Sequence, residues 1–331
     1  MDLQNNRMLK TAAADALQAA PNDPKKLILL HSAAMLLLSL LLTVVDYLLE
    51  HAIADTGGLG GLGTRSVLST VQSCLQLSQL ILLPFWQIGY TYVTIKFARK
   101  EAAQPMDLCK GFFLFLPMLR LLLLQGLLYI GIGIAASNLG MILFSLTPWS
   151  APFMSAAMDM MYGGGSAEDM SYAMEKMQET GAVPLVICSI LVFIAIAVPF
   201  FYRFRMAQYL LLDGKETGAL AAMRTSGKLM RGNGIALFKL DLSFWWFYAL
   251  DLLVTTICYA DMLLAMLGIT LPVDATFAFF ATFVVYLAAQ LALYWWRKNE
   301  VSTTYAYFYH VLSQPKEETP APVAQNQPWY Y

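Results

Sequence analysis

Long apolar stretches are the feature of this chain that most restricts its fold. They lie near residues 27–49, 67–97, 112–146, 182–204, 235–260 and 273–296. Each is long enough to cross a hydrocarbon core of roughly 30 Å, which takes about 20 helical residues. The chain is 58% hydrophobic and 13% charged, whereas soluble proteins are typically about 45–50% apolar and about 25% charged. We therefore predict an all-α, polytopic integral membrane helix bundle with about six transmembrane helices.

The basic residues predict the orientation of these spans. Lys and Arg near the ends of a span are retained on the cytoplasmic side. If the N-terminus is inside, nearly all of the 21 Lys and Arg residues fall in inner segments, while Arg65 and Lys176 lie outside and Arg120 lies within the membrane. Both termini are therefore expected in the cytoplasm. The net charge of -1 and this distribution provide no basic face for nucleic acid.

The same pattern divides the chain into three parts. Residues 1–26 are predicted to form a cytoplasmic amphipathic segment, and residues 27–312 the six-helix transmembrane domain. The Pro-rich residues 313–331 are expected to be a disordered cytoplasmic tail. The outer loop 147–181 carries acidic and Met residues, and it is either a solvated loop or a lid or docking surface.

Cysteine and histidine give no sign of a reaction centre. The chain has four Cys and three His, without a CxxC pair and without the HExxH spacing of a metalloprotease. No serine nucleophile motif of the G-x-S-x-G type is present. We therefore expect no metal, no cofactor and no catalytic residue, and a protein that is not an enzyme.

Two inner loops resemble each other and place a proline at the same point. "PFWQIGYTYVTIKFARKE" begins at Pro84, and "PFFYRFRMAQYLLLDGKE" begins at Pro199. Both segments leave an inward-running span and enter a basic inner loop, which suggests two duplicated helix hairpins. Helices interrupted at equivalent positions indicate the substrate site of a transporter. The plainer interpretation is that proline is tolerated in membrane helices, where neighbouring groups satisfy the freed carbonyl.

A basic amphipathic helix is predicted near residues 213–231, before the fifth span. Asp213 and Glu216 have the spacing of a capping box at its start. Arg224, Lys228 and Arg231 recur at helical spacing on one face, and Met residues lie on the other. This pattern is typical of a helix that lies in the membrane interface. The three basic residues are therefore candidate contacts for anionic lipid headgroups, and a Gly-Asn-Gly turn ends the helix.

Arg120 and Asp251 are the ionisable residues predicted deepest in the membrane. Counted from the nearest inner basic residue of each span, they stand roughly 15 and 18 Å from the inner boundary. An unpaired charge there is costly, so such residues face the bundle and find partners. We predict an Arg120–Asp251 ion pair, either as part of the scaffold or in an ion or substrate pathway. Asp46 and Asp241 are alternative partners.

The segment after the basic helix resembles a known family. "SGKLMRGN" at residues 226–233, "LFKLDLSF" at residues 237–244 and Trp246 are similar to the core of an uncharacterised family of bacterial integral membrane proteins, domain of unknown function 975. The aromatic "TYAYFYHVL" before the tail is similar as well. The resemblance implies a multi-pass protein of a bacterial cell membrane, with no known chemistry. The Met-rich outer loop departs from the family's pattern.

Two functions from different classes fit these observations. The first is a non-catalytic membrane protein that binds lipid, through anionic headgroups, or another membrane protein. The alternative is a small permease with its site near the proline-containing spans two and four. The sequence names neither a substrate nor a partner.

Overall fold

The fold is helical throughout the part of the chain that the structure describes. This structure, a computed structural model, describes residues 5–55, 62–162, 181, 183–258 and 275–314. The helices are α1 (Asn6–Gln18), α2 (Pro24–Asp55), α3 (Leu62–Ala98), η2 (Pro105–Cys109), α4 (Lys110–Phe113), α5 (Phe115–Ser145), α6 (Ser150–Tyr162), α8 (Val183–Phe204), α9 (Ala207–Leu212), α10 (Ala219–Leu229), α11 (Gly234–Ser243), α12 (Trp245–Cys258), α14 (Ala275–Leu293), η4 (Tyr294–Lys298) and α15 (Asn299–Ser313). The predicted all-α class is confirmed.

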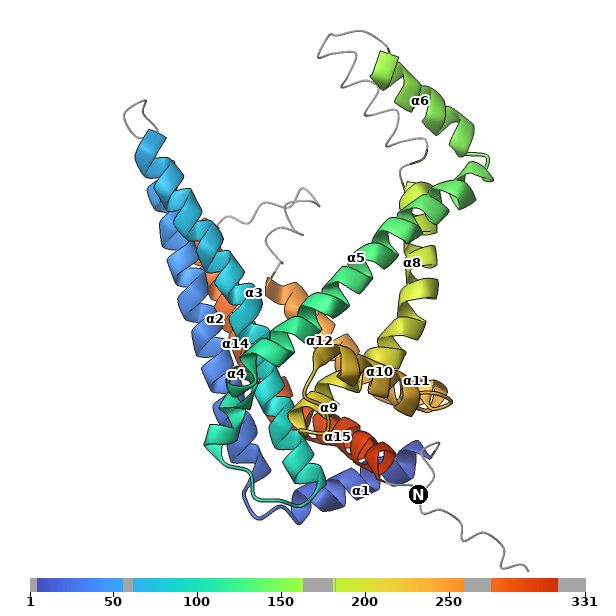
Figure 1. Cartoon of the computed structure of the whole chain (residues 1–331). Coiled ribbons are helices and arrows are strands. Elements are labelled where there is room, and N and C mark those ends of the chain that lie inside the picture. The colour runs from blue at the N-terminus through green and yellow to red at the C-terminus, as the bar shows by residue number, and fades with distance from the viewer. Residues whose placement is uncertain (1–4, 56–61, 163–180, 182, 259–274, 315–331) are drawn as a thin grey trace, which may run out of the picture.

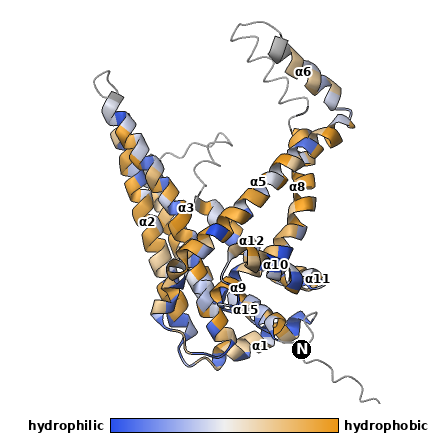
Figure 2. Cartoon of the chain, in the orientation of Figure 1, coloured by the Kyte–Doolittle hydropathy of each residue, from blue (hydrophilic) through white to orange (hydrophobic). Residues whose placement is uncertain are grey.

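The long helices form two arms that diverge from a common base (Figure 1). One arm contains α2, α3 and α14, and the other pairs α5 with α8. The shorter helices α1, α9, α10, α11 and α15 lie at the base. Hydrophobic residues run along both arms, and hydrophilic residues gather at the base (Figure 2). The arms are therefore the parts suited to lipid, and the base is suited to a membrane boundary.

Four helices are long and apolar enough to cross a membrane, namely Pro24–Ala54, Gly63–Ala98, Phe115–Ser145 and Val183–Leu212. They coincide with the first four predicted spans. A fifth span is possible only if α11 and α12, which are bent by 59°, count as one. The described part of the chain thus gives four or five candidate spans. The sixth predicted span overlaps α14, and its first residues lie outside the described ones, so it stays a prediction.

The bend between α11 and α12 separates the predicted fifth span into two helices. Phe244 ends α11 with φ -112° and ψ 14°, and the α11 carbonyls near it lose their helical partners. Lys10 of α1 donates a hydrogen bond from Nζ to the Ser243 carbonyl at 3.0 Å. The same Nζ lies 4.0 Å from the centroid of the Phe244 ring. The N-terminal helix therefore supports the bend.

The predicted amphipathic N-terminal segment is helical between Asn6 and Gln18, and its apolar face contacts protein. Leu9, Ala13 and Ala16 are fully buried, and α1 packs mainly along α15. The largest core cluster lies here at the base, where residues of α3, α5, α8 to α12 and α15 meet. The predicted tail lies outside the described residues from residue 315 on. The first part of the predicted outer loop 147–181 contains α6, and its residues 163–180 lie outside the described ones.

Candidate functional site: a basic pocket at the base of the α5–α8 arm

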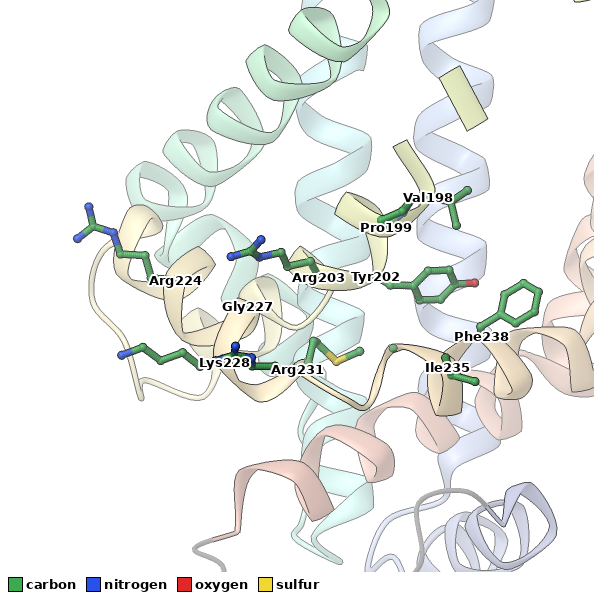
Figure 3. A pocket seen from close by; sticks show the side chains of 12 residues that line it. Val198, Pro199, Tyr202, Arg203, Arg224, Gly227, Lys228, Arg231, Ile235 and Phe238 are labelled. Carbon is green, nitrogen blue, oxygen red and sulfur yellow. The ribbon is translucent and has the colours of Figure 1, made fainter. Parts of the chain in front are cut away.

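A pocket of about 1000 Å³ lies between the end of α8, the helix α10 and the start of α11. Four basic residues line it, and they are Arg203, Arg224, Lys228 and Arg231. The rest of its wall is largely apolar or aromatic, with Val198, Pro199, Tyr202, Met230, Ile235 and Phe238. Figure 3 shows Arg203, Arg224 and Lys228 extending to one side, with Tyr202 and Phe238 on the other. The pocket is thus basic at one end and apolar at the other.

Helix α10 positions three of the basic residues. Arg224 and Lys228 are four residues apart, and Arg231 follows just after the helix, so all three share one exposed face. Ala222 and Met223 on the other face are buried in the base core. The predicted basic face is therefore present. The apolar face, however, packs on protein, whereas an isolated interfacial helix would place it in lipid.

The predicted capping box at the start of this helix is absent. Helix α10 begins at Ala219 with Gly218 as N-cap and without a side-chain cap. Asp213 instead forms a salt bridge of 2.6 Å with Arg99 and accepts a hydrogen bond from the Tyr309 hydroxyl at 2.9 Å. Glu216 accepts from the Thr225 hydroxyl at 2.6 Å. Tertiary partners thus take up both carboxylates that could have capped the helix.

Arg203 enters the pocket from α8 because α10 allows a close approach. The buried Ser226 donates a hydrogen bond from Oγ to the main-chain carbonyl of Arg203 at 2.8 Å. A Cβ added at Gly227 would stand 3.1 Å from the Arg203 Nε. The Arg203 side chain can therefore lie across α10 because Gly227 leaves room for it. Arg203 and Tyr202 are not among the predicted headgroup contacts, because a contact between two helices leaves no local pattern in the sequence.

The turn after α10 sets an apolar stripe beside the basic face. Gly232 has φ +83°, a conformation that side chains rarely adopt. The Asn233 amide donates to the Leu229 carbonyl at 2.9 Å and so satisfies a carbonyl at the end of α10. On α11, Ile235, Phe238 and Leu242 are exposed and share one face. Basic and apolar surfaces therefore meet along this helix pair.

The basic residues of the pocket have no acidic partner among the described residues. The salt bridges of that part of the chain use Lys96, Arg99, Arg205, Lys215 and Arg297. None of them involves a basic residue of the pocket. Like charges that are gathered together repel each other unless an opposite charge is near. Within the described residues, the four positive charges of the pocket are therefore not neutralised by a carboxylate.

Beside the pocket, Asp241 is fully engaged and does not neutralise it. Its Oδ2 atom lies 2.5 Å from Arg205 Nη1 and accepts from the Tyr202 hydroxyl at 2.8 Å. Its Oδ1 accepts from the Tyr305 hydroxyl at 2.6 Å. Burial raises the pKa of the Tyr305 hydroxyl, and the neighbouring Tyr248 and Asp241 raise it further. Tyr305 therefore stays protonated and remains a donor, and Tyr202 is held at the pocket wall.

The family of the chain follows from a comparison with known protein families. The model of the family described as protein of unknown function (DUF975) matches residues 3–316. The chain belongs to this family. The match covers every described element from α1 to α15, so the pocket lies within the family's domain. No curated protein and no solved structure matches the chain. Membership of DUF975 therefore supports the predicted resemblance and assigns no activity.

The two predicted helix breaks at proline are not breaks. Pro84 lies inside α3 and Pro199 inside α8, and both helices continue past them. Membrane helices tolerate such prolines because local groups satisfy the freed carbonyl. Pro199 nevertheless lines the basic pocket, five residues before the end of α8. It marks the site without interrupting the helix.

The predicted Arg120–Asp251 ion pair is not among the salt bridges of the described residues. Arg120 is exposed and lies in the second turn of α5, which begins at Phe115. Its Cα is thus only about 7.5 Å along that helix, because the chain before it is a separate short helix. Asp251 accepts a hydrogen bond from the Gln290 amide at 2.8 Å. The sequence count assumed continuous helices on both sides, and both are broken.

A second polar cluster is buried where α2, α3 and η4 meet. Lys298 is 6% exposed, and its Nζ donates to Gln87 Oε1 at 3.1 Å. His31 is fully buried, with Nε2 3.4 Å from the same oxygen and its ring stacked on Tyr90 at 4.6 Å. The π-helical segment η4 carries Lys298, and π-helical turns often occur at functional sites. No sequence motif linked these residues, because they are far apart in the chain.

Proposed function

We propose that this chain is an integral protein of a bacterial cell membrane that binds anionic lipid headgroups in the basic pocket, without catalysis. The observation that carries the proposal is the set of four basic residues, without an acidic partner among the described residues, in a pocket with an apolar wall. Each basic residue near an anionic leaflet contributes about 1 kcal/mol to attraction. A site of this composition suits a lipid better than a soluble anion.

The topology supports this assignment. The charge bias of the sequence predicts that the inner loops, and with them the base, lie in the cytoplasm. The ends of α1 and α15 lie together at that base, which agrees with both termini on one side. Helix α10 then stands at headgroup level. The exposed apolar residues of α11 lie beside it, where acyl chains begin.

The test is lipid retention by the full-length protein in detergent, measured by native mass spectrometry after incubation with an equimolar mixture of phosphatidylglycerol and phosphatidylcholine. The pocket variant carries Arg203→Gln, Arg224→Gln, Lys228→Gln and Arg231→Gln. A control variant with the same charge change carries Arg7→Gln, Lys26→Gln, Arg65→Gln and Lys239→Gln, all at exposed positions. The wild type and the control should retain phosphatidylglycerol preferentially, and the pocket variant should not. Equal retention by all three proteins would refute the proposal.

The alternative function is a small permease, and the buried polar cluster is the observation that favours it. Gln87 lies in α3, one turn after Pro84. Its side-chain oxygen contacts Lys298 and His31. Ionisable residues buried in a helix bundle commonly mark ion or proton pathways. The probe is an imposed pH gradient across proteoliposomes that contain a pH-sensitive dye. A permease of protons should dissipate the gradient in a manner that Lys298→Met abolishes, whereas a leak equal to that of empty liposomes rejects this alternative.

A further inference from the structure

We propose that the basic pocket selects a lipid whose headgroup ends in a free phosphate, a phosphomonoester or diphosphate, over lipids whose phosphate is a capped diester. The inference rests on the proposed lipid binding and names the class of lipid. It is drawn from the charge balance of the pocket, from the geometry of Arg203 and Gly227, and from the apolar wall.

The charge balance favours a headgroup with more than one negative charge. The pocket gathers Arg203, Arg224, Lys228 and Arg231, and no carboxylate within the described parts of the chain forms a salt bridge with them. A phosphodiester lipid offers a single negative charge. A terminal phosphate carries about -1.5 to -2 at neutral pH and has three acceptor oxygens. A terminal phosphate therefore reduces the repulsion between the four positive side chains more than a phosphodiester does.

The position of Arg203 supports recognition of the phosphate itself. Its carbonyl is fixed by the Ser226 hydroxyl at 2.8 Å, and its side chain crosses α10 at Gly227, where a Cβ would stand 3.1 Å from Nε and 3.8 Å from Nη2. Arg224 and Lys228 lie within one helical turn on either side of Gly227. Arg binds phosphate through two parallel hydrogen bonds, while Lys acts as a point charge. Arg203, Arg224 and Lys228 are all exposed, and three basic side chains gathered around Gly227 are suited to the several oxygens of a terminal phosphate.

The apolar wall distinguishes a lipid from free phosphate. Ile235 is 71% exposed and Phe238 is 49% exposed, and both line the pocket. They continue into the exposed Leu242 on the same face of α11. Free phosphate would leave this surface uncovered, whereas the glycerol and acyl carbons of a lipid would cover it. Burial of apolar surface adds to the affinity roughly in proportion to the area covered.

The experiment measures the affinity of the full-length protein in non-ionic detergent for short-chain lipids at constant ionic strength. The probes are dioctanoyl phosphatidic acid, dioctanoyl phosphatidylglycerol, dioctanoyl phosphatidylcholine, glycerol 3-phosphate and inorganic phosphate. We expect phosphatidic acid to bind about fivefold more tightly than phosphatidylglycerol, the factor that corresponds to one extra charge contact. Arg203→Gln should remove most of this preference. Lys239→Gln, an exposed basic change on α11 outside the pocket, should retain it.

The other possible results of this experiment test different parts of the proposal. If phosphatidic acid and phosphatidylglycerol bind equally well, the terminal-phosphate inference is wrong, while anionic-lipid binding stands. If glycerol 3-phosphate or inorganic phosphate binds as tightly as phosphatidic acid, the site takes soluble phosphate and the lipid part is wrong. If no anionic lipid binds more tightly than phosphatidylcholine, the proposed function falls as well. If Lys239→Gln loses the preference as Arg203→Gln does, the pocket is not the site that recognises the terminal phosphate.

Discussion

Arg203 crosses helix α10 at Gly227, where an added Cβ would stand 3.1 Å from the Arg203 Nε. The contact brings a basic side chain of α8 among those of α10. The main-chain carbonyl of Arg203 is held by the neighbouring Ser226, so the two helices are joined at this point. The pocket therefore depends on a residue without a side chain.

Substitution of Gly227 should separate binding from stability. Gly227→Leu places a branched side chain where Arg203 lies, so it should displace the guanidinium and abolish preferential retention of phosphatidylglycerol. Because Gly is unfavourable inside a helix by roughly 1 kcal/mol, the melting temperature in detergent should not fall. Gly227→Ala meets only the flexible side chain of Arg203 and should retain most of the binding. Full lipid retention by Gly227→Leu would contradict the arrangement.

The partner of Asp251 can be tested by comparing two neighbours. Gln290 is 4% exposed and donates to the Asp251 carboxylate at 2.8 Å, whereas Arg120 is exposed on α5. Gln290→Leu removes the donor and should lower the yield of folded protein, since it leaves the half-buried Asp251 carboxylate without this hydrogen bond. Arg120→Gln should have little effect. The measurement is the monodisperse fraction in detergent by size-exclusion chromatography.

A charge swap between Arg120 and Asp251 tests the ion pair that the sequence predicts. If Arg120 and Asp251 pair, each single reversal, Arg120→Asp or Asp251→Arg, lowers the folded yield and the double variant restores it. The structure predicts no such restoration, because Asp251 is bound by Gln290. Rescue in the double variant would show that the ion pair predicted from the sequence exists in the membrane.

The buried cluster at η4 predicts coupling between Gln87 and Lys298. Gln87→Leu removes the side-chain oxygen that accepts from Lys298 Nζ and should destabilise the protein by about 1–3 kcal/mol. Lys298→Met removes the donor to Gln87 and should also destabilise the protein, whereas replacement of both partners by apolar side chains is often neutral or stabilising. The double variant should therefore be more stable than Gln87→Leu alone. Thermal unfolding in detergent measures all three, and strictly additive effects would speak against the contact.

The topology predicts the side of each loop. A reporter that is active only in the cytoplasm should work when it is fused after Lys100, after Arg231 or at the C-terminus. It should fail after Gly61 or Gly164. These residues lie in the predicted outer loops, whereas the Lys and Arg residues are concentrated in the inner ones. Activity of the Gly164 fusion would overturn the predicted orientation of spans three and four.

Much of this site could be predicted from the sequence, because it depends on local periodicity. Arg224, Lys228 and Arg231 share a face by helical spacing alone, and the structure places them so. Arg203 could not be predicted, since it reaches the same place from another helix through a tertiary contact at Gly227. Sequence distance cannot report such a contact.

The same limit applies to the fold. The first four spans were predicted because length and hydropathy are properties of a single segment. The bend at Phe244 was not, since the apolar run continues through it and its support comes from Lys10, more than two hundred residues away. The predicted Arg120–Asp251 ion pair is missing from the described residues for a related reason. Depth was counted along continuous helices, whereas the helices that precede these two residues end at Phe113 and Ser243.

Photocrosslinking of a lipid to the full-length protein in a bilayer tests the central claim most directly. The probe is phosphatidylglycerol with a photoreactive group at the glycerol, and the crosslinked peptides are mapped by mass spectrometry. We predict that crosslinks concentrate between residues 198 and 238, which include every residue that lines the pocket, and that the four-residue pocket variant loses them. Crosslinks spread over α5 and over residues 183–197 of α8, unchanged in that variant, would contradict lipid binding at this site.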